Sequence, residues 1–171
     1  MIPPLAIPTL STGRLTLRPF AEGDLDAFAA IWADEETTRY VGGVKTREGT
    51  WLKLAGYLGH WVLRGYGQWA VVETASGRLI GRCGLWNPVG WPELEVGWTL
   101  ERSTWGQGFA TEAGERAIAW AREELGLTRI ASCIVPGNER SIAVAERLGM
   151  SFDRMDTFPE GHEAAVYAMA L

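Results

Sequence analysis

The sequence predicts a mixed α/β fold in one domain, and three observations support this prediction. The chain has 171 residues, of which 47% are hydrophobic, and this allows one domain with a substantial core. Segments with the two-residue period of a strand alternate with four segments that have the period of a helix. The sequence contains no repeat, linker or low-complexity stretch, so we expect residues 1–171 to fold as a single unit.

The first part of the chain is predicted to form one strand followed by two helices. Residues 14–20 alternate between apolar and polar side chains, as a half-buried strand does. Asp24 and Thr46 are expected to cap the two helices, with a loop at residues 34–45 between them. His60 lies outside the apolar stripe of the second helix and is expected on the exposed surface. That stripe is predicted to contain Trp51, Leu54, Ala55, Leu58, Trp61 and Val62.

The rest of the chain is predicted to supply the other strands and two more helices. One helix follows a glycine-rich loop at residues 105–111. The other begins at Asn138, a preferred N-cap residue, and ends at Gly149. The remaining strands are predicted, in order, at residues 67–73, 79–86, 93–100, 129–135, 150–155 and 164–171.

The strand, loop and helix at residues 93–121 form the most informative stretch. The loop reads WGQGFAT, with two glycines two positions apart just before the helix. Glycine lets backbone N–H groups converge with no Cβ in the way, and the first N–H groups of a helix have no partner inside the helix. Such a loop is suited to bind an anion, in particular a phosphate group.

Three phosphate-binding loops, and a simple turn without a ligand, are alternatives for this stretch. A Walker-type loop requires GxxxxGK[ST], which the sequence lacks. A dinucleotide loop requires a third glycine and a later acidic residue, but Thr111 occupies that glycine position and the next strand ends in PG. A third pattern, [QR]xxGx[GA] between a strand and a helix, fits residues 103–108 except that Ser103 replaces Gln or Arg.

The third pattern is the acyl-CoA pyrophosphate loop of the GNAT superfamily of N-acetyltransferases, which this sequence resembles. The strings TGRLTLRPF, WGQGFATEA and PGNERSIAVAERLGMSF resemble its ribosomal-protein N-terminal acetyltransferase (RimJ/RimL-like) branch, and the resemblance spans residues 14–171. It implies a mixed, mostly antiparallel central sheet of about seven strands with four helices. This sheet is expected to splay between its fourth and fifth strands.

The resemblance also implies acetyl-CoA as the co-substrate. The glycine loop would hold the pyrophosphate through backbone N–H groups, and the middle of the strand at residues 93–100 would pair with the pantetheine arm. Asn138 is implied to contact this arm and Ser141 to lie near the sulfur, although a capping role alone would also explain Asn138. The implied coenzyme-binding residues are Val96, Gly97, Trp98, Trp105, Gly106, Gln107, Gly108, Phe109, Ala110, Thr111, Asn138 and Ser141.

Acyl transfer to an amine requires a base, an oxyanion site and a proton donor for the thiolate. Glu95, beside the implied thioester, is the first candidate for the base, acting directly or through water, and Glu93 is the second. A solvated strand face is the alternative for both. A backbone N–H near Val96 or Gly97 is expected to stabilise the oxyanion. Ser141 is the candidate proton donor.

The acceptor is expected to be a primary amine. The branch resemblance favours the α-amino group of a protein or peptide. This group has a pKa of about 8, so a weaker base can deprotonate it than a lysine side chain requires, whose pKa is about 10.4. A small amine, an amino acid or an antibiotic is the alternative acceptor, and a non-catalytic acyl-CoA sensor is the alternative function. Trp32, Trp86, Glu95 and His162 are candidate acceptor contacts, with ordinary packing as the alternative for the tryptophans.

Composition narrows the partners and the compartment. The net charge of −5 argues against a nucleic-acid partner. The segment MIPPLAIPTL lacks basic residues and is interrupted by prolines, so we expect neither a signal peptide nor a membrane span, although this arm could pair two copies in a homodimer. Cys83 and Cys133 are expected to be reduced core residues of a cytoplasmic protein, without a metal. Neither lies in a setting that activates a thiol, so we expect direct transfer in a ternary complex.

Overall fold

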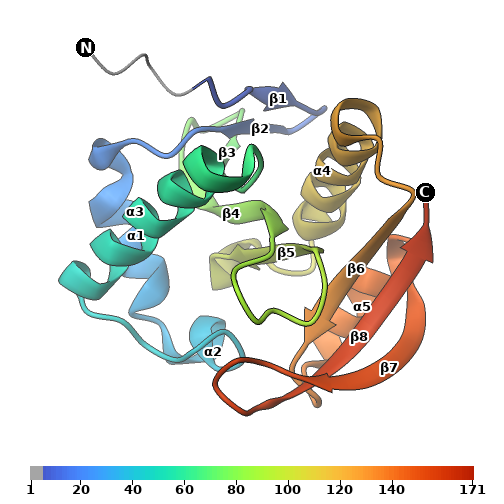
Figure 1. Cartoon of the computed structure of the whole chain (residues 1–171). Helices are drawn as coiled ribbons and strands as arrows, with labels where there is room; N and C mark the ends of the chain where they lie inside the picture. Colours follow the sequence, from blue (N-terminus) through green and yellow to red (C-terminus); the bar gives the residue numbers. More distant parts are fainter. Residues whose placement is uncertain (1–5) are drawn as a thin grey trace.

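The computed structural model describes residues 6–171, so the first five residues of the predicted N-terminal arm lie outside the described part. One eight-stranded sheet forms the centre of the molecule, in the order β1-β2-β3-β4-β5-β6-β8-β7 (Figure 1). Every neighbouring pair of strands runs antiparallel except β5 and β6. The prediction of a mixed, mostly antiparallel α/β fold is confirmed.

The elements follow the predicted order. The strands are β1 (Leu10–Ser11), β2 (Leu15–Arg18), β3 (Gln68–Glu73), β4 (Leu79–Trp86), β5 (Glu95–Leu100), β6 (Arg129–Ile134), β7 (Ser151–Thr157) and β8 (Glu163–Ala170). The helices are α1 (Leu25–Trp32), α2 (Glu35–Thr38), α3 (Arg47–Arg64), α4 (Phe109–Leu125) and α5 (Glu139–Arg147), with 3₁₀ turns at Glu22–Asp24 and Arg102–Thr104.

The sheet splays between β5 and β6, as expected for its fourth and fifth predicted strands. These two strands pair at one register position only, Glu95 with Ala131. By contrast, β4 and β5 pair at six positions, from Gly81 with Leu100 to Trp86 with Glu95. Beyond the single pair, the facing edges of β5 and β6 are therefore open to another hydrogen-bonding partner.

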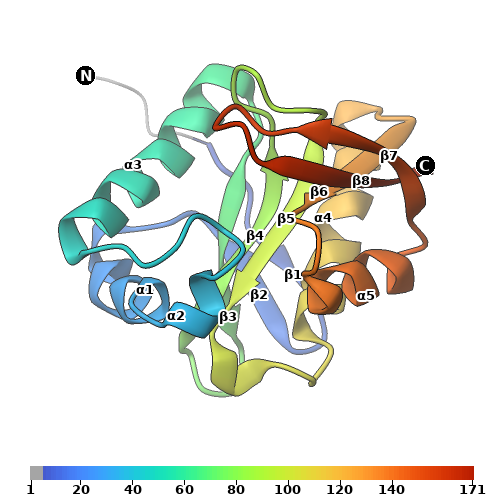
Figure 2. The same cartoon turned by 90° about the horizontal axis from the view of Figure 1, so that it is seen from below.

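The helices cover both faces of the sheet (Figures 1 and 2). Helix α1 packs on one face with α3 beside it, and α4 packs on the other face with α5 beside it. The larger core lies mainly under α4, and the smaller one lies mainly under α1 and α3. The smaller core contains Phe20, Phe28, Ile31, Trp32, Leu54, Tyr57, Ala70 and Leu79.

Two short elements were not predicted. Strand β1 has only two residues, and its Leu10 pairs with Leu17 at the edge of the sheet. Helix α2 lies within the stretch expected to be a loop, where the side chain of Asp34 accepts a hydrogen bond from the N–H of Thr37. The sequence DEET carries this capping signal, but a four-residue helix is too short to show helical periodicity.

The helix caps agree with the sequence in two cases of three. Thr46 caps α3 through the N–H of Gly49, and Asn138 caps α5 through the N–H of Ser141. Asp24 makes no capping hydrogen bond to α1. Its carboxylate instead forms an ion pair with Arg18 at 2.7 Å and accepts the N–H of Ala21, because this acidic side chain is buried and needs a charged partner.

The apolar stripe of α3 is rotated from the predicted one. The buried residues of this helix are Thr50, Leu54, Tyr57, His60 and Trp61. Trp51 and Val62 are exposed, with 43% and 66% of their surfaces accessible. The expectation that His60 is exposed is wrong, since 6% of its surface is accessible. The predicted stripe contains purely apolar side chains and tryptophans, whereas the buried face of the helix also carries Tyr57 and His60, whose rings have polar atoms.

Candidate active site

A groove of about 910 Å³ runs along the C-terminal half of β5 and is lined by residues of α2 and α5. Figure 2 shows these two helices on either side of β5. Its floor is formed by Trp98, Thr99 and Leu100 of β5. The loop before α4 and the first turns of α4 and α5 complete the lining. The groove therefore brings together the glycine loop and the N-terminal ends of two helices, which are anion-binding features.

The glycine loop has the conformation that its sequence predicts. Gly106 and Gly108 have φ angles of +74° and +81°, in the left-handed region that glycine enters without a Cβ clash. Gly108 is also the N-cap of α4 and offers no capping side chain. The first-turn N–H groups of α4 are therefore left for another acceptor, at the positive end of the helix dipole.

Trp105 fixes the loop on both sides. Its indole N–H donates to the carbonyl of Leu100 at 2.8 Å, which attaches the loop to the end of β5. The guanidinium of Arg140, from the first turn of α5, lies 4.4 Å from the centre of its ring. The side chain of Trp105 therefore contacts both the end of β5 and the first turn of α5.

The structure brings most of the predicted coenzyme residues to this groove. Val96, Gly97 and Gln107 are not among the lining residues, although β5 carries the first two toward the splay. The assignment of all twelve to acetyl-CoA stays a prediction. Those that line the groove are Trp98, Trp105, Gly106, Gly108, Phe109, Ala110, Thr111, Asn138 and Ser141.

Ser141 is placed to donate a hydrogen bond into the groove. Its hydroxyl oxygen accepts from the side-chain amide of Asn138 at 3.1 Å. Its backbone N–H donates to the carbonyl oxygen of the same side chain at 3.4 Å. Because Asn138 occupies an acceptor position of the hydroxyl, the proton of Ser141 remains available to a ligand.

Glu95 is buried at the point where β5 and β6 meet. It is 6% exposed, and its Oε2 accepts the backbone N–H of Cys133 on β6 at 2.7 Å. Burial raises the pKa of Glu95 to about 7, while that N–H and the charge of Arg82 oppose the rise. The alternative of a solvated strand face is therefore excluded for Glu95. A carboxyl group with this pKa suits acid–base chemistry near neutral pH.

Arg82 lies on the same side of the sheet as Glu95 and was not among the residues predicted for the site. A Cβ on Gly97 would lie 3.2 Å from Nη1 of Arg82 and 3.5 Å from Oε1 of Glu95, so both side chains lie over the bare Cα of this glycine. Nη1 of Arg82 also donates to Oε1 of Gln68 at 3.1 Å. The signal in the sequence was a lone arginine inside the apolar run LIGRCGLW.

Glu93 is held in a set of ion pairs with two arginines. Its carboxylate lies 2.8 Å from Arg129 and 3.1 Å from Arg154. Burial would raise the pKa of Glu93, but hydrogen bonds from these two arginines lower it below its ordinary value. Glu93 also precedes β5, so the strand does not aim it at the splay. These contacts favour a structural role over that of a general base.

The predicted acceptor contacts do not gather at the groove. Trp32 is wholly buried in the smaller core, so in this structure it is a packing residue and not a pocket wall. Trp86 is half-buried and lies 5.4 Å from the ring of Tyr57. His162 is exposed in the connection between β7 and β8. Whether Trp86 and His162 contact an acceptor stays a prediction.

His60 joins α3 to the connection between β4 and β5. Its Nδ1 lies 2.7 Å from the carbonyl oxygen of Tyr66, and its Nε2 lies 3.2 Å from the backbone N of Asn87. Because a backbone N–H can only donate, Nε2 is the acceptor and Nδ1 carries the proton. Burial lowers the pKa of His60, which favours this neutral form, and the ring stacks on Trp86 at 4.5 Å.

Further groove residues come from the short helix that was not predicted and from the end of α5. Because α2 was not predicted, the sequence alone does not indicate the wall of the groove that this helix forms. Arg147, one helical turn beyond Ala143, adds a positive charge to the opposite wall. The residues contributed by α2 and the chain just after it are Glu36, Thr37, Tyr40 and Val41.

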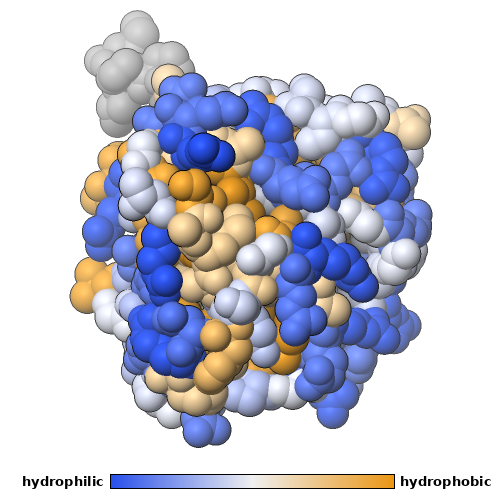
Figure 3. Space-filling model, turned by 90° about the vertical axis from the view of Figure 1, so that its right-hand side faces the viewer, coloured by the Kyte–Doolittle hydropathy of each residue, from blue (hydrophilic) through white to orange (hydrophobic). Residues whose placement is uncertain are grey.

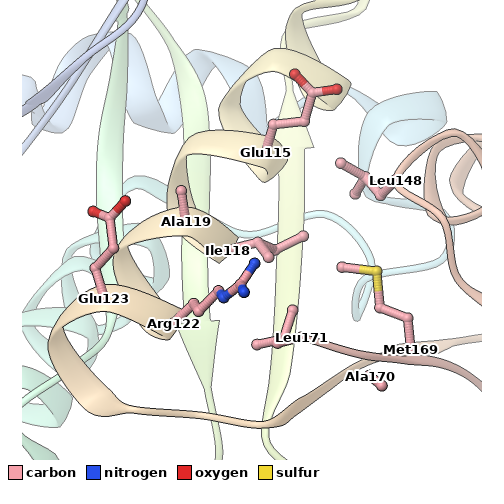
Figure 4. Close-up of a pocket in the computed structure, with 9 residues that line it drawn as sticks. All are labelled: Glu115, Ile118, Ala119, Arg122, Glu123, Leu148, Met169, Ala170 and Leu171. Carbon is pink, nitrogen blue, oxygen red and sulfur yellow. The ribbon is translucent and has the colours of Figure 1, made fainter.

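A second, smaller hollow of about 370 Å³ lies between α4 and the end of β8. Figure 3 shows the right-hand side of the molecule in Figure 1, where hydrophobic residues are surrounded by hydrophilic ones. The floor of the hollow includes Ile118, Leu148 and Met169, and Figure 4 shows Glu115 and Glu123 at its sides. This lining has no loop with left-handed glycines, so the groove is the candidate active site.

Other sequence expectations concern the cysteines, metals and membranes. Cys83 is buried as expected, whereas Cys133 is only half-buried because it lies on β6 beside the splay. Within residues 6–171, no cluster of three or more His, Cys, Asp or Glu side chains is arranged to hold a metal ion. The helices in this part of the chain are all too short or too polar to cross a bilayer.

A sheet that opens beside a glycine loop at a helix start is the arrangement expected of an acyl-CoA-dependent transferase. The chain belongs to the acetyltransferase (GNAT) family, whose sequence profile matches residues 14–151. It is therefore an acyltransferase of the N-acetyltransferase type, and GNAT domains use acetyl-CoA. The predicted family and enzyme class are confirmed.

Known relatives cover most of the chain. The crystal structure of an acetyltransferase from Agrobacterium tumefaciens is 35% identical, with a TM-score of 0.86 over 96% of this chain and 95% of that one. The uncharacterized N-acetyltransferase p20 of Bacillus licheniformis is 30% identical over 82% of this chain and 80% of its own length. YdaF of Bacillus subtilis, provisionally described as a ribosomal N-acetyltransferase, is 44% identical over 57 residues, which are 33% of this chain and 31% of YdaF. These comparisons confirm the likeness to the RimJ/RimL-like branch.

Proposed function

We propose that this protein transfers the acetyl group of acetyl-CoA to the α-amino group of a protein or peptide N-terminus, directly and within a ternary complex. The observation that carries the proposal is the combination of two features of β5. Its C-terminal half leads into the glycine loop at the start of α4, and its N-terminal end carries Glu95, whose pKa is raised to about 7. One strand thus links an anion site to a candidate base.

Acetyl-CoA supplies the activated thioester. In this proposal, the loop at residues 105–111 binds the pyrophosphate through its backbone N–H groups. A backbone N–H of Val96 or Gly97 stabilises the oxyanion, and the hydroxyl of Ser141, which already accepts from Asn138, donates a hydrogen bond to the leaving thiolate. Glu95 takes the proton of the amine, directly or through water.

The match of pKa values supports an α-amino acceptor. A base with a pKa of about 7 is close to an α-amino group at about 8, and it is more than three units below a lysine side chain at about 10.4. The description of YdaF as a ribosomal N-acetyltransferase points the same way. We also propose a cytoplasmic location, no nucleic-acid or membrane partner, and a homodimer, none of which is needed for the chemistry.

The test is thiol release from acetyl-CoA across a panel of amines. The panel holds peptides with a free N-terminus and blocked lysines, peptides with a blocked N-terminus and free lysines, amino acids, polyamines and aminoglycosides. Turnover confined to free peptide N-termini supports the proposal. Turnover with a small amine or antibiotic alone would keep the chemistry and replace the acceptor. Bound CoA without turnover on any amine would favour a sensor of acyl-CoA.

A further inference from the structure

Two motifs that carry the family resemblance meet in space, although they lie far apart in the sequence. Arg14 belongs to TGRLTLRPF, and Glu112 belongs to WGQGFATEA. Nη2 and Nε of Arg14 lie 2.6 Å and 2.7 Å from Oε2 of Glu112. Oε1 of Glu112 accepts the backbone N–H of Arg14 at 2.9 Å and the hydroxyl of Thr12 at 2.5 Å. The start of β2 is thus attached to the first turn of α4.

Arg14 also touches the phosphate loop itself. Its Nη1 donates to the carbonyl oxygen of Gln107 at 2.9 Å, and its guanidinium lies 4.4 Å from the centre of the Phe109 ring. A trans peptide holds its N–H opposite its carbonyl. With the Gln107 carbonyl turned toward Arg14, the N–H of Gly108 is therefore directed away from Arg14, and Gly108 lines the groove.

Glu112 presents an electrostatic problem that Arg14 solves. A carboxylate in the first turn of a helix is favourable for the helix dipole, but it repels a phosphate that binds at the same end. Burial would raise the pKa of Glu112, but hydrogen bonds from Thr12 and Arg14 lower it below its ordinary value, so the group is an anion. The Arg14 guanidinium cancels this charge at contact distance.

We propose that Arg14 is a positioning residue for the coenzyme, acting in two ways through its neighbours. It holds the phosphate loop through the Gln107 carbonyl, and it neutralises Glu112 at the anion-binding end of α4. The inference rests on the proposed binding of the coenzyme pyrophosphate to this loop. Neither Arg14 nor Glu112 lines the groove, so both would act on the coenzyme indirectly. The proposal thereby gives a role to one residue in each of the strings TGRLTLRPF and WGQGFATEA.

The test separates the pyrophosphate from the rest of the donor. The variants are Arg14→Met, which leaves Glu112 without its cation, and Arg14→Met/Glu112→Gln, which removes both charges. Arg47→Met is the control, because it also deletes an arginine–carboxylate ion pair between two elements, to Asp26 at 2.8 Å between α3 and α1, although this pair is more exposed than that of Arg14 and Glu112. The readouts are the Kd for CoA by calorimetry and the ratio of kcat/KM for acetyl-CoA to kcat/KM for acetyl-pantetheine, which lacks the pyrophosphate.

We expect Arg14→Met to raise the Kd for CoA and to lower the donor ratio, each about tenfold, as loss of a charge-assisted contact does. The double variant is expected to recover part of both losses, and Arg47→Met to match the wild type. Equal losses with both donors would mean a merely structural role and would overturn the proposal. A double variant with the same Kd for CoA and the same donor ratio as Arg14→Met would overturn the proposal that Arg14 acts by neutralising Glu112. Wild-type protein that binds no CoA would instead refute the proposed function itself.

Discussion

The two faces of the β5 region differ in what they are made of. On the α4 side, the part of the groove that is suited to bind an anion consists of backbone groups, with left-handed glycines and the N-terminal ends of two helices. On the α1 and α3 side, the important groups are buried side chains, with Glu95, Arg82 and His60 each held by partners from other strands or loops. A site made of backbone depends on a local sequence pattern, whereas a site made of side chains depends on the whole fold.

The first test of this comparison removes the carboxylate of Glu95, on the side built from buried side chains. Glu95→Gln keeps the size of the side chain and its acceptor for the Cys133 N–H, but it removes the base. We expect kcat to fall by a factor of about 100 or more, with the Kd for CoA changed by less than about twofold. Steady-state kinetics and calorimetry measure the two effects. A variant that retains wild-type kcat would show that Glu95 is not the base.

Glu95 should also make both the activity and the stability of the protein depend on pH. In the wild type, kcat/KM should rise with a midpoint near pH 7 as Glu95 loses its proton, and Glu95→Gln should lose this step. Because the folded-state pKa lies above the unfolded one, the folded protein binds this proton more tightly and loses stability as the pH rises toward and through 7. Denaturant unfolding at pH 8 should therefore show Glu95→Gln more stable than the wild type by about 1–3 kcal/mol, with little difference near pH 4.

A single methyl group tests the backbone-built side. Gly108→Ala forces a residue with a Cβ into φ +81°, which costs about 1–2 kcal/mol. We expect the loop to relax from this conformation and the Kd for CoA to rise about tenfold. Gly59→Ala in α3 is the control, since its Cβ would meet nothing within 4 Å. This control should gain about 0.5–1 kcal/mol of stability and leave CoA binding at the wild-type value.

His60→Leu should affect stability more than chemistry. It leaves the Tyr66 carbonyl and the Asn87 N–H without their partner, and we expect a loss of about 2 kcal/mol, or about 4–8 °C in Tm. Since burial lowers the pKa of His60, the wild type should lose part of its stability as the pH falls below about 6.5, and this component should vanish in the variant. His162→Leu, at the exposed histidine, is the control that should change neither quantity.

The smallest effect tests the observed stripe of α3. Val62 is 66% exposed, so Val62→Ser should change the free energy of unfolding by less than about 0.5 kcal/mol. Leu54 is 4% exposed, and Leu54→Ala should cost about 2–4 kcal/mol. Equal losses in the free energy of unfolding for the two variants would mean that Val62 is buried, as the stripe predicted from the sequence requires. Chemical denaturation measures both.

The same contrast explains which features were predictable. The glycine loop, the Asn138 cap and the order of the main strands follow from patterns within a few residues, and the structure contains them. The burial of His60 depends on Asn87, which lies 27 residues away, and the ion pairs of Glu93 depend on arginines from β6 and β7. No local pattern encodes such distant partners. Helix α2 was missed for the opposite reason, since it is too short for any periodicity.

The single residue pair between β5 and β6 has a consequence for the cooperativity of the molecule. It divides the sheet into one block of β1–β5 and another of β6–β8, and few strand hydrogen bonds break when the blocks separate. Amides on the β6 side of β5 should therefore exchange with solvent faster than those that face β4. A ligand that adds backbone-like hydrogen bonds in the gap would couple the two blocks, so that they unfold together.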